Sequence, residues 1–423
     1  MIRTLAILLV AASAAHAQDW PRFRGPGGQG HSPETSLPGT WDATKNIAWK
    51  TAIPGEGWSS PIVWGDTIFL TSTTDAGKTC HVIGVGAADG KILWDTTVFE
   101  QPTERKEGKN SYATPTPCTD GERVYAVFGG GSVAALDLAG KALWTNHDVK
   151  FYSRHGLGAS PILHDGLLIM PYDGSTRVDK AGQYPKVSDE ERTGWQLPWD
   201  KAEVAALDVK TGKRVWTGKR GMSRIAHVTP MVVDGQILSI AGDAVQGFDP
   251  KSGKLLWTVV SEGEGVTPSP AVADGMVFAS SGFPKPTLRA IKLGGTGDVT
   301  STNIVWEQKK GCPTQPSLLY VKPYLYAVTE SGVATCYKSE SGEIVWQERL
   351  AEKAAFSASP IFADGKIYAL AESGETVVMA PGPEFKILSR NALGEKCQAS
   401  PAVSRGRIFI RSDKTLFCIA AAK

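Results

Sequence analysis

Residues 206 to 216 read Ala-Leu-Asp-Val-Lys-Thr-Gly-Lys-Arg-Val-Trp, and the end of this stretch recurs along the chain. The recurring element is a glycine with a tryptophan four positions after it. It occurs at Gly90 and Trp94, Gly140 and Trp144, Gly212 and Trp216, Gly253 and Trp257, and Gly342 and Trp346, while Trp306 has the same phase without the glycine. A glycine turn followed by a short aliphatic and aromatic run predicts a strand, so the chain repeats one β-unit.

A proline that opens an apolar run is the second recurring mark. It is found in Ser60-Pro61, Thr116-Pro117, Ser160-Pro161, Thr229-Pro230, Ser269-Pro270, Gln315-Pro316, Ser359-Pro360 and Ser400-Pro401. Asp-Gly hairpin turns follow at Asp120-Gly121, Asp165-Gly166, Asp234-Gly235, Asp274-Gly275 and Asp364-Gly365. Most of these prolines are separated by roughly 40 to 50 residues, the length of one four-stranded propeller blade. Eight prolines therefore predict eight blades.

The two ends of the chain predict how the ring closes. Only three strands fit between Pro401 and Lys423, whereas residues 46 to 51, which include Trp49, resemble an outer strand without earlier strands of its own. We expect this strand to complete the last blade and so to hide a sheet edge. The predicted fold is all-β, an eight-bladed β-propeller of four-stranded antiparallel blades over residues 46–423, preceded by a leader at 18–45.

The composition agrees with a β-rich protein and excludes some partners. The 423 residues include 46 Gly, 26 Pro and 13 Trp, and the formal net charge is +2. This balance provides no basic stripe for nucleic acid. No stretch after the first 17 residues has the length of a transmembrane helix, and we expect a monomer.

The first 17 residues have the pattern of a secretory signal peptide. Arg3 precedes an apolar run from Leu5 to Ala15, and Ala15-His16-Ala17 forms a small-x-small cleavage site. We therefore expect cleavage after Ala17 and a periplasmic or secreted protein.

The repeat resembles the tryptophan-docking motif, A-x-D-x-x-T-G-x-x-x-W, of pyrroloquinoline quinone (PQQ) propellers. Residues 206–216 match it, and looser copies end at Trp144, Trp257 and Trp346. The start of the mature chain, Asp19 to Pro26, also resembles secreted PQQ-like repeat proteins. The resemblance implies a quinoprotein-type propeller, related in its repeat to the propeller subunit of the outer-membrane β-barrel assembly machinery. It also implies a structural role between blades for Trp49, Trp94, Trp144, Trp216, Trp257, Trp306 and Trp346.

The same resemblance implies a cofactor only if further residues are present. PQQ dehydrogenases carry an adjacent Cys-Cys disulfide and bind Ca²⁺ through a Glu and an Asn beside an Asp base. This chain has no Cys-Cys pair, and we match no residue to those roles. We therefore expect no catalytic residue, cofactor or metal, with PQQ and calcium belonging to the alternative function. Gly25 to Gly30 spells G-x-G-x-x-G without a preceding strand, so we interpret it as a chance match.

Six cysteines leave two interpretations open. They are Cys80, Cys118, Cys312, Cys336, Cys397 and Cys418. An even number in an exported chain permits disulfides, but pairs on first and third strands of one blade are too far apart. Unpaired buried cysteines are the other interpretation.

The loops that enter the blades predict a binding face. The loop from Phe99 to Ala113 is long and charged, and an insertion near Tyr172 to Glu203 contains Asp173, Arg177, Trp195 and Trp199. Candidates for the mouth of the central channel are Trp58, Tyr112, Arg154, His155, Arg224 and His227. Together they predict a cationic, aromatic pocket for an anionic or polar ligand, although ordinary loop capping is the alternative.

Three functions follow. The preferred one is a non-enzymatic exported scaffold that binds a protein, a peptide or a small polar ligand at the loop face and channel mouth. The alternative is a PQQ-dependent quinoprotein oxidoreductase of the alcohol or sugar dehydrogenase type. The third is a propeller that binds a sugar or another small molecule without catalysis.

Overall fold

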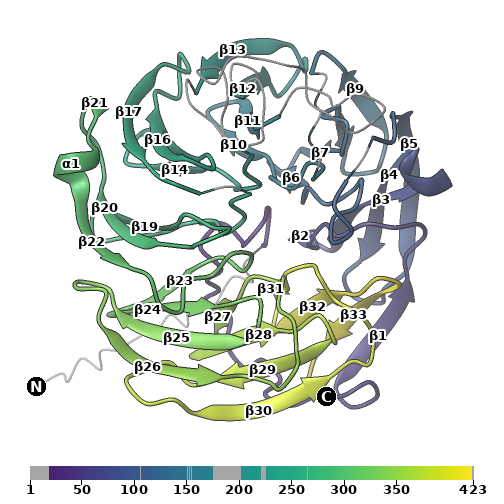
Figure 1. Ribbon diagram of the computed structural model, residues 1–423. Coiled ribbons are helices and arrows are strands. Elements are labelled where there is room, and N and C mark those ends of the chain that lie inside the picture. The colour runs from purple at the N-terminus through teal and green to yellow at the C-terminus, as the bar shows by residue number, and fades with distance from the viewer. Residues whose placement is uncertain are drawn as a thin grey trace, which may run out of the picture.

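Eight antiparallel sheets surround one axis and form a closed ring of blades (Figure 1). The computed structural model describes residues 19–104, 106–149, 151, 153, 155–174, 202–220, 225–263 and 265–421. In this part of the chain each sheet has four strands, and the fourth sheet has a short fifth one. The predicted all-β, eight-bladed propeller is confirmed.

The first four blades contain β2 (Ile62–Trp64), β3 (Thr67–Thr74), β4 (Thr79–Gly86) and β5 (Ile92–Glu100); β6 (Cys118–Thr119), β7 (Arg123–Val127), β8 (Val133–Asp137) and β9 (Ala142–Asn146); β10 (Ile162–His164), β11 (Leu167–Tyr172), β12 (Glu203–Asp208) and β13 (Arg214–Lys219); and β14 (Met231–Val233), β15 (Gln236–Ile240), β16 (Ala244–Phe248), β17 (Leu255–Val260) and the added β21 (Gly297–Asp298).

The last four blades contain β18 (Ala271–Ala273), β19 (Met276–Ser280), β20 (Leu288–Lys292) and β22 (Ile304–Gln308); β23 (Leu319–Val321), β24 (Tyr324–Val328), β25 (Val333–Lys338) and β26 (Ile344–Arg349); β27 (Ile361–Ala363), β28 (Lys366–Leu370), β29 (Glu375–Met379) and β30 (Ile387–Ala392); and β31 (Ala402–Ser404), β32 (Arg407–Arg411), β33 (Thr415–Ile419) and β1 (Ile47–Ala52). The turn η1 (Asp75–Gly77) and the helix α1 (Thr300–Asn303) lie outside the sheets. Among the described residues, no helix has the length and apolar character that crossing a membrane requires.

The ring closes where the first strand of the chain meets the last. β1 pairs antiparallel with β33, with Trp49 opposite Cys418, and the purple and yellow ends lie side by side (Figure 1). This confirms that the N-terminal strand completes the eighth blade. Arg411 strengthens the closure, because its Nη1 donates to the Oγ of Ser59 at 2.6 Å and to the Thr71 carbonyl at 2.8 Å in the first blade.

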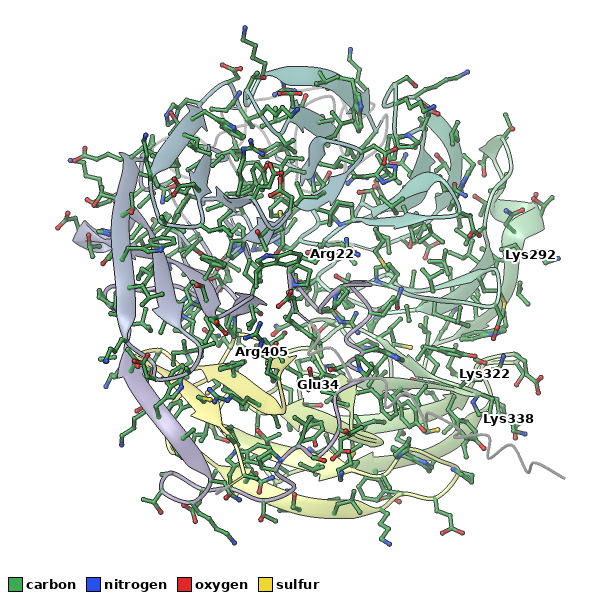
Figure 2. The ribbon with its side chains drawn as sticks, turned by 180° about the vertical axis from the view of Figure 1, so that it is seen from behind. Arg22, Glu34, Lys292, Lys322, Lys338 and Arg405 are labelled. Carbon is green, nitrogen blue, oxygen red and sulfur yellow. The ribbon has the colours of Figure 1, made fainter. Side chains whose placement is uncertain are left out.

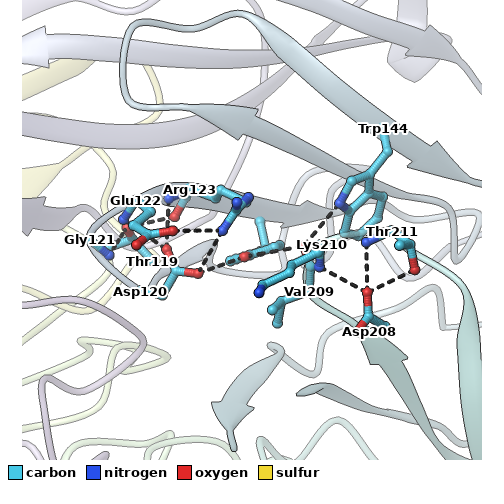
Figure 3. Close-up of polar contacts among 11 residues, drawn as sticks. Thr119, Asp120, Gly121, Glu122, Arg123, Trp144, Asp208, Val209, Lys210 and Thr211 are labelled. Atoms are coloured by element: carbon cyan, nitrogen blue, oxygen red, sulfur yellow. Dashed lines mark hydrogen bonds and ion pairs between the residues drawn. The ribbon is translucent and has the colours of Figure 1, made fainter. Parts of the chain in front are cut away.

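Trp144 shows how one blade docks on the next (Figure 3). Its Nε1 donates to the Val209 carbonyl oxygen at 3.0 Å. Asp208 holds this turn by accepting from the backbone N–H of Thr211 at 2.8 Å. Gly212 has a φ of +69°, and a Cβ there would lie 2.4 Å from the indole of Trp144. The turn therefore needs glycine for its backbone and for the approach of the ring.

The same contact from an indole to a carbonyl oxygen recurs around the ring. It joins Trp49 to Ala87, Trp94 to Leu138, Trp216 to Pro250, Trp306 to Ser339 and Trp346 to Gly382. Trp257 differs, because its Nε1 donates to Oε1 of Gln236 in its own blade at 2.5 Å. Beside it, β21 pairs in parallel with β17 and lies against Trp257.

A belt of Ser and Thr hydroxyls joins the inner strands around the channel. In each contact, the backbone N–H of one belt residue donates to the hydroxyl oxygen of its counterpart in the next blade, at 2.9 to 3.1 Å. Seven such bonds run from the fifth blade through the ring to the fourth. The belt residues are Ser60, Thr116, Ser160, Thr229, Ser269, Ser317, Ser359 and Ser400.

In the sixth blade, the belt residue differs from the one that the proline mark predicts. The proline mark placed Gln315 there, but each belt residue lies two positions before its inner strand, and β23 begins at Leu319. Ser317 therefore occupies the belt, accepting from the Ser269 N–H at 3.0 Å and donating its own N–H to Ser359. The position requires a hydroxyl acceptor, whereas the proline shifts by two residues, from the position after the belt residue to the position before it.

The leader forms the floor of the ring. Figure 2 shows Arg22 near the centre of the rear face and Glu34 in the same segment. The leader contacts seven blades through Trp20 with Val63, Pro21 with Thr119, Gln29 with Met231 and with Val272, Arg24 with Leu318, Ser32 with Phe362, and Glu34 with Gly406. It is thus part of the folded propeller. Its Gly25-to-Gly30 run forms turns, with Gly25, Gly28 and Gly30 at positive φ.

Substituting Ser317→Ala should lower the free energy of unfolding by about 1–3 kcal/mol, because a buried N–H loses its acceptor. Urea denaturation measures the loss. The control is Gln315→Ala in the same blade, where only the half-buried bond from the Ser357 hydroxyl is lost and we expect a change of about 1 kcal/mol or less. Equal losses in the two variants would contradict the assignment of Ser317 to the belt.

Candidate functional site

A cavity of about 540 Å³ occupies the central channel. Phe23 of the leader lines its floor, and seven of the eight belt residues line its waist. This volume lies in the range of small-molecule and side-chain pockets.

The upper wall of the cavity is a second ring of side chains. Each member lies two positions before a belt residue, so that alternation along the chain brings both to the channel. All eight line the cavity: Trp58, Thr114, Gly158, His227, Thr267, Gln315, Ser357 and Gln398. We call this set the upper ring. Its members carry no permanent charge.

The structure brings some of the predicted mouth residues together. Trp58, His155 and His227 line the cavity. Tyr112 does not line it; its hydroxyl donates to the Glu104 carbonyl at 2.5 Å and so anchors the loop entering the second blade.

Of the other predicted residues, only Asp173 lies in the part of the chain that the structure describes. Arg154 and Arg224 are outside the described residues, as are Arg177, Trp195 and Trp199 of the insertion. Asp173 is described, and it forms a buried ion pair with Arg220, with Nε and Oδ1 2.5 Å apart.

Two histidines meet at the rim. The rings of His155 and His227 are edge to face, with centroids 6.3 Å apart. Burial, with a contribution from the charge of His155, lowers the pKa of His227 to about 3. His227 is therefore neutral near pH 7, and its Nδ1 has no hydrogen-bond partner among the described residues.

An ion pair crosses the channel mouth and connects the loop that enters the second blade to the seventh blade. Lys109 Nζ lies 2.8 Å from Oε1 of Glu372, which also accepts from the Ser357 hydroxyl. Burial works to raise the pKa of Glu372, but the Lys109 and Ser357 contacts outweigh it and hold the pKa low. The long charged loop singled out in the sequence is thus tied across the channel.

The sequence did not single out Gln398, Phe283 or Lys109. Both amide atoms of Gln398 and the Nε1 of Trp58 are buried without a partner in the described structure. Phe283 is 60% exposed and lies at the same mouth. Of Gln398, Phe283 and Lys109, only Gln398 belongs to the upper ring. Counting back two positions from the belt residue Ser400 finds it.

Two buried arginines lie directly behind the cavity wall. Arg24 follows Phe23 and donates Nη2 to the carbonyls of Leu318 and Gln29 at 2.5 and 3.0 Å. Arg411 bonds only to oxygens of Ser59 and Thr71 in the described structure. Burial lowers the pKa of each guanidinium to about 9, so both remain charged at neutral pH.

The described channel residues do not fit the calcium and base set of a PQQ dehydrogenase. Glu107 is the carboxylate of the described lining, and its side chain is 64% exposed. Asn110 already uses its Oδ1 for Ser111 and Thr114 and its Nδ2 for the His155 carbonyl. No group of three or more metal-ligating side chains occurs among the described residues.

The cysteines are free thiols. All six are buried, and none lines the cavity. Of the two interpretations left open by the sequence, unpaired buried cysteines match the structure. Burial raises the pKa of Cys397 and of Cys418 to about 12, so these thiols stay protonated.

Comparison with known proteins identifies the family. The sequence model of the family described as outer membrane protein assembly factor BamB matches residues 40–151 and 200–423. The chain belongs to this family.

Individual relatives are distant. BamB of Moranella endobia (strain PCIT) is 23% identical over 312 residues, which is 72% of this chain and 74% of that protein. Tetrathionate hydrolase of Acidithiobacillus ferrooxidans is 22% identical over 248 residues, and the match covers 56% of this chain and 44% of the hydrolase, so the chain spans less than half of that relative. The solved structure of a europium-containing methanol dehydrogenase superposes with a TM-score of 0.65 at 11% identity, covering 95% of this chain and 98% of that one. That likeness shows the fold alone.

The buried His227 gives a pH dependence with a definite sign. Its pKa is lower in the folded protein than in the unfolded chain, so stability is lost as the pH falls from about 6.5 toward 3. The slope from this one group is at most about 1.4 kcal/mol per pH unit. We expect His227→Gln to flatten the unfolding free energy between pH 6.5 and 4, measured by urea denaturation. Parallel curves for the two proteins would show that His227 is not buried as a neutral ring.

Proposed function

We propose that this chain is an exported, non-enzymatic scaffold of outer-membrane protein assembly, which binds another protein at its loop face and channel mouth. The observation that carries the proposal is the side chain of Phe283, which lies exposed beside the channel cavity. The family description supports a partner that is a protein.

The surface around the cavity suits a protein partner. Phe283 places an aromatic ring at the rim with 60% of its surface exposed. Aromatic anchors next to a pocket are the usual centres of binding energy at interfaces. Export follows from the predicted signal peptide, which lies outside the described residues, and no cofactor is part of the proposal.

Photo-crosslinking in the native cells tests the proposal. A photoreactive phenylalanine analogue at position 283 should yield a crosslink to an outer-membrane protein or to a subunit of its assembly machinery. The control is the same analogue at position 93, because Leu93 is 55% exposed but lies on the outer strand β5. Phe283→Ser should lower co-purification of the crosslinked partner about tenfold or more, as expected for a hot-spot residue. Equal crosslinking from both positions would overturn the proposal.

Titration with PQQ and Ca²⁺ tests the oxidoreductase alternative. We expect no shift in the visible spectrum of PQQ and no change in the melting temperature, since the described lining lacks the metal and base set. A stoichiometric spectral change with thermal stabilisation would instead favour the quinoprotein function.

A further inference from the structure

A hydroxyl, an imidazole and a carboxylate form a line of hydrogen bonds across the first blade. Thr74, His81 and Asp95 belong to β3, β4 and β5, three strands that lie side by side (Figure 1). His81 lies opposite Ser72 on one neighbouring strand and opposite Thr97 on the other. Thr74 and Asp95 are each two positions from these residues, so alternation places Thr74, His81 and Asp95 on the same face of the sheet. We call these three residues the triad.

The two hydrogen bonds of the triad fix the tautomer of the imidazole. Nδ1 of His81 lies 3.0 Å from Oδ1 of Asp95, and an ionised carboxylate only accepts hydrogen bonds. Nδ1 of the neutral ring therefore carries the proton. Nε2 keeps its lone pair and accepts from the Thr74 hydroxyl, whose Oγ1 lies 3.0 Å away. A hydroxyl, a base and a group that orients the base are the three parts of an activated nucleophile.

The Thr74 hydroxyl has no competing role in the described structure. Thr74 directly precedes the turn η1, but its side chain does not cap that turn. Ser72, the hydroxyl residue opposite His81, is fully buried and donates to the Pro54 carbonyl instead. The side chains of His81 and Asp95 are 15% and 29% exposed, and Thr74 is half-buried. All three residues of the triad thus have surface in contact with solvent.

The turn that follows Thr74 is held in a strained conformation. Residues 75–77 all have positive φ, at 50°, 54° and 96°. Left-handed backbone is costly for residues that carry a Cβ, so the surroundings must impose it on the first two. Nε2 of Gln101 donates to the Gly77 carbonyl at 2.9 Å, and a Cβ on Gly77 would lie 1.9 Å from the Tyr112 ring. A nucleophile beside a sharp, strained turn is a known arrangement for presenting a reactive hydroxyl.

We propose that Thr74 is an acyl-acceptor site, which takes an acyl group from an activated ester such as a thioester or an aryl ester. Oγ1 of Thr74 attacks the carbonyl carbon of the donor while Nε2 of His81 takes the hydroxyl proton. The bond from that carbon to the leaving group then breaks, and His81 returns the proton to the departing thiolate or aryloxide. Asp95 stabilises the imidazolium that forms between the two transfers. The products are an ester of Thr74 and a free thiol or phenol.

The acyl-acceptor site is independent of the proposed scaffold function. None of the triad residues lines the channel cavity, whereas Phe283 does. The chain is itself the reactant in this step, so the site adds a modification to the scaffold. A crosslink from position 283 without acylation of Thr74 would refute the acyl-acceptor site alone, and the reverse outcome would refute the scaffold alone.

Reaction of the purified protein with 4-nitrophenyl acetate tests the site. We expect a burst of one equivalent of 4-nitrophenolate and a mass increase of one acetyl group, which peptide mapping assigns to Thr74. Thr74→Ala should lose the burst, whereas Thr74→Ser, which keeps the hydroxyl, should react at least as fast. Acetylation of lysines without acetylation of Thr74 would overturn the inference.

Substitutions of the other two triad residues test whether the hydroxyl is activated. His81→Gln and Asp95→Asn should each lower the rate of Thr74 acetylation about 100-fold or more, because the hydroxyl loses its base or the base loses its tautomer. The matched control is Thr97→Ala, an exposed threonine opposite His81 that is outside the triad, and it should leave the rate unchanged. Melting temperatures check that each variant is folded. Equal rates in His81→Gln and the unmodified sequence would show that the imidazole does not activate Thr74.

Discussion

The hydroxyl belt is the interaction on which the rest of the ring depends. A propeller blade buries both faces of its middle strands against neighbours, so adjacent inner strands must start at one height around the axis. The bond from each belt N–H to the next hydroxyl fixes that height, at 2.9 to 3.1 Å in seven contacts. The docking indoles then fix the outer edges, as Trp144 does on the turn at Val209.

The belt also determines what lines the channel. Since side chains alternate, a hydroxyl at the belt commits the residue two positions earlier to the upper ring. In this chain these positions carry one indole, one imidazole and two amides among smaller residues. The leader closes the floor below, and the buried arginines lie behind the wall. Scaffold and site thus share the same short segments.

Much of this arrangement could be predicted from the sequence. Eight prolines predicted the number of blades, and the strand around Trp49 predicted how the ring closes. Both predictions succeeded because each depends on a short stretch of sequence. Ser317 was missed because the proline was used as the mark, while the structural requirement is the hydroxyl. Gln398 looked ordinary in sequence, and the ion pair of Lys109 with Glu372 joins residues 263 positions apart. The sequence also did not predict that the leader forms the floor of the ring, because its contacts join residues far apart in the chain. Arg24, for example, bonds to Leu318 across 294 positions.

Native-state hydrogen exchange of the belt amides tests the central claim most directly. If the belt holds the ring together, the N–H groups of Ser60, Ser317 and Ser400 should exchange only through global unfolding, with one common free energy. Separate, lower free energies for individual belt amides, with exchange of single blades, would show that the belt does not couple the blades and would contradict the account.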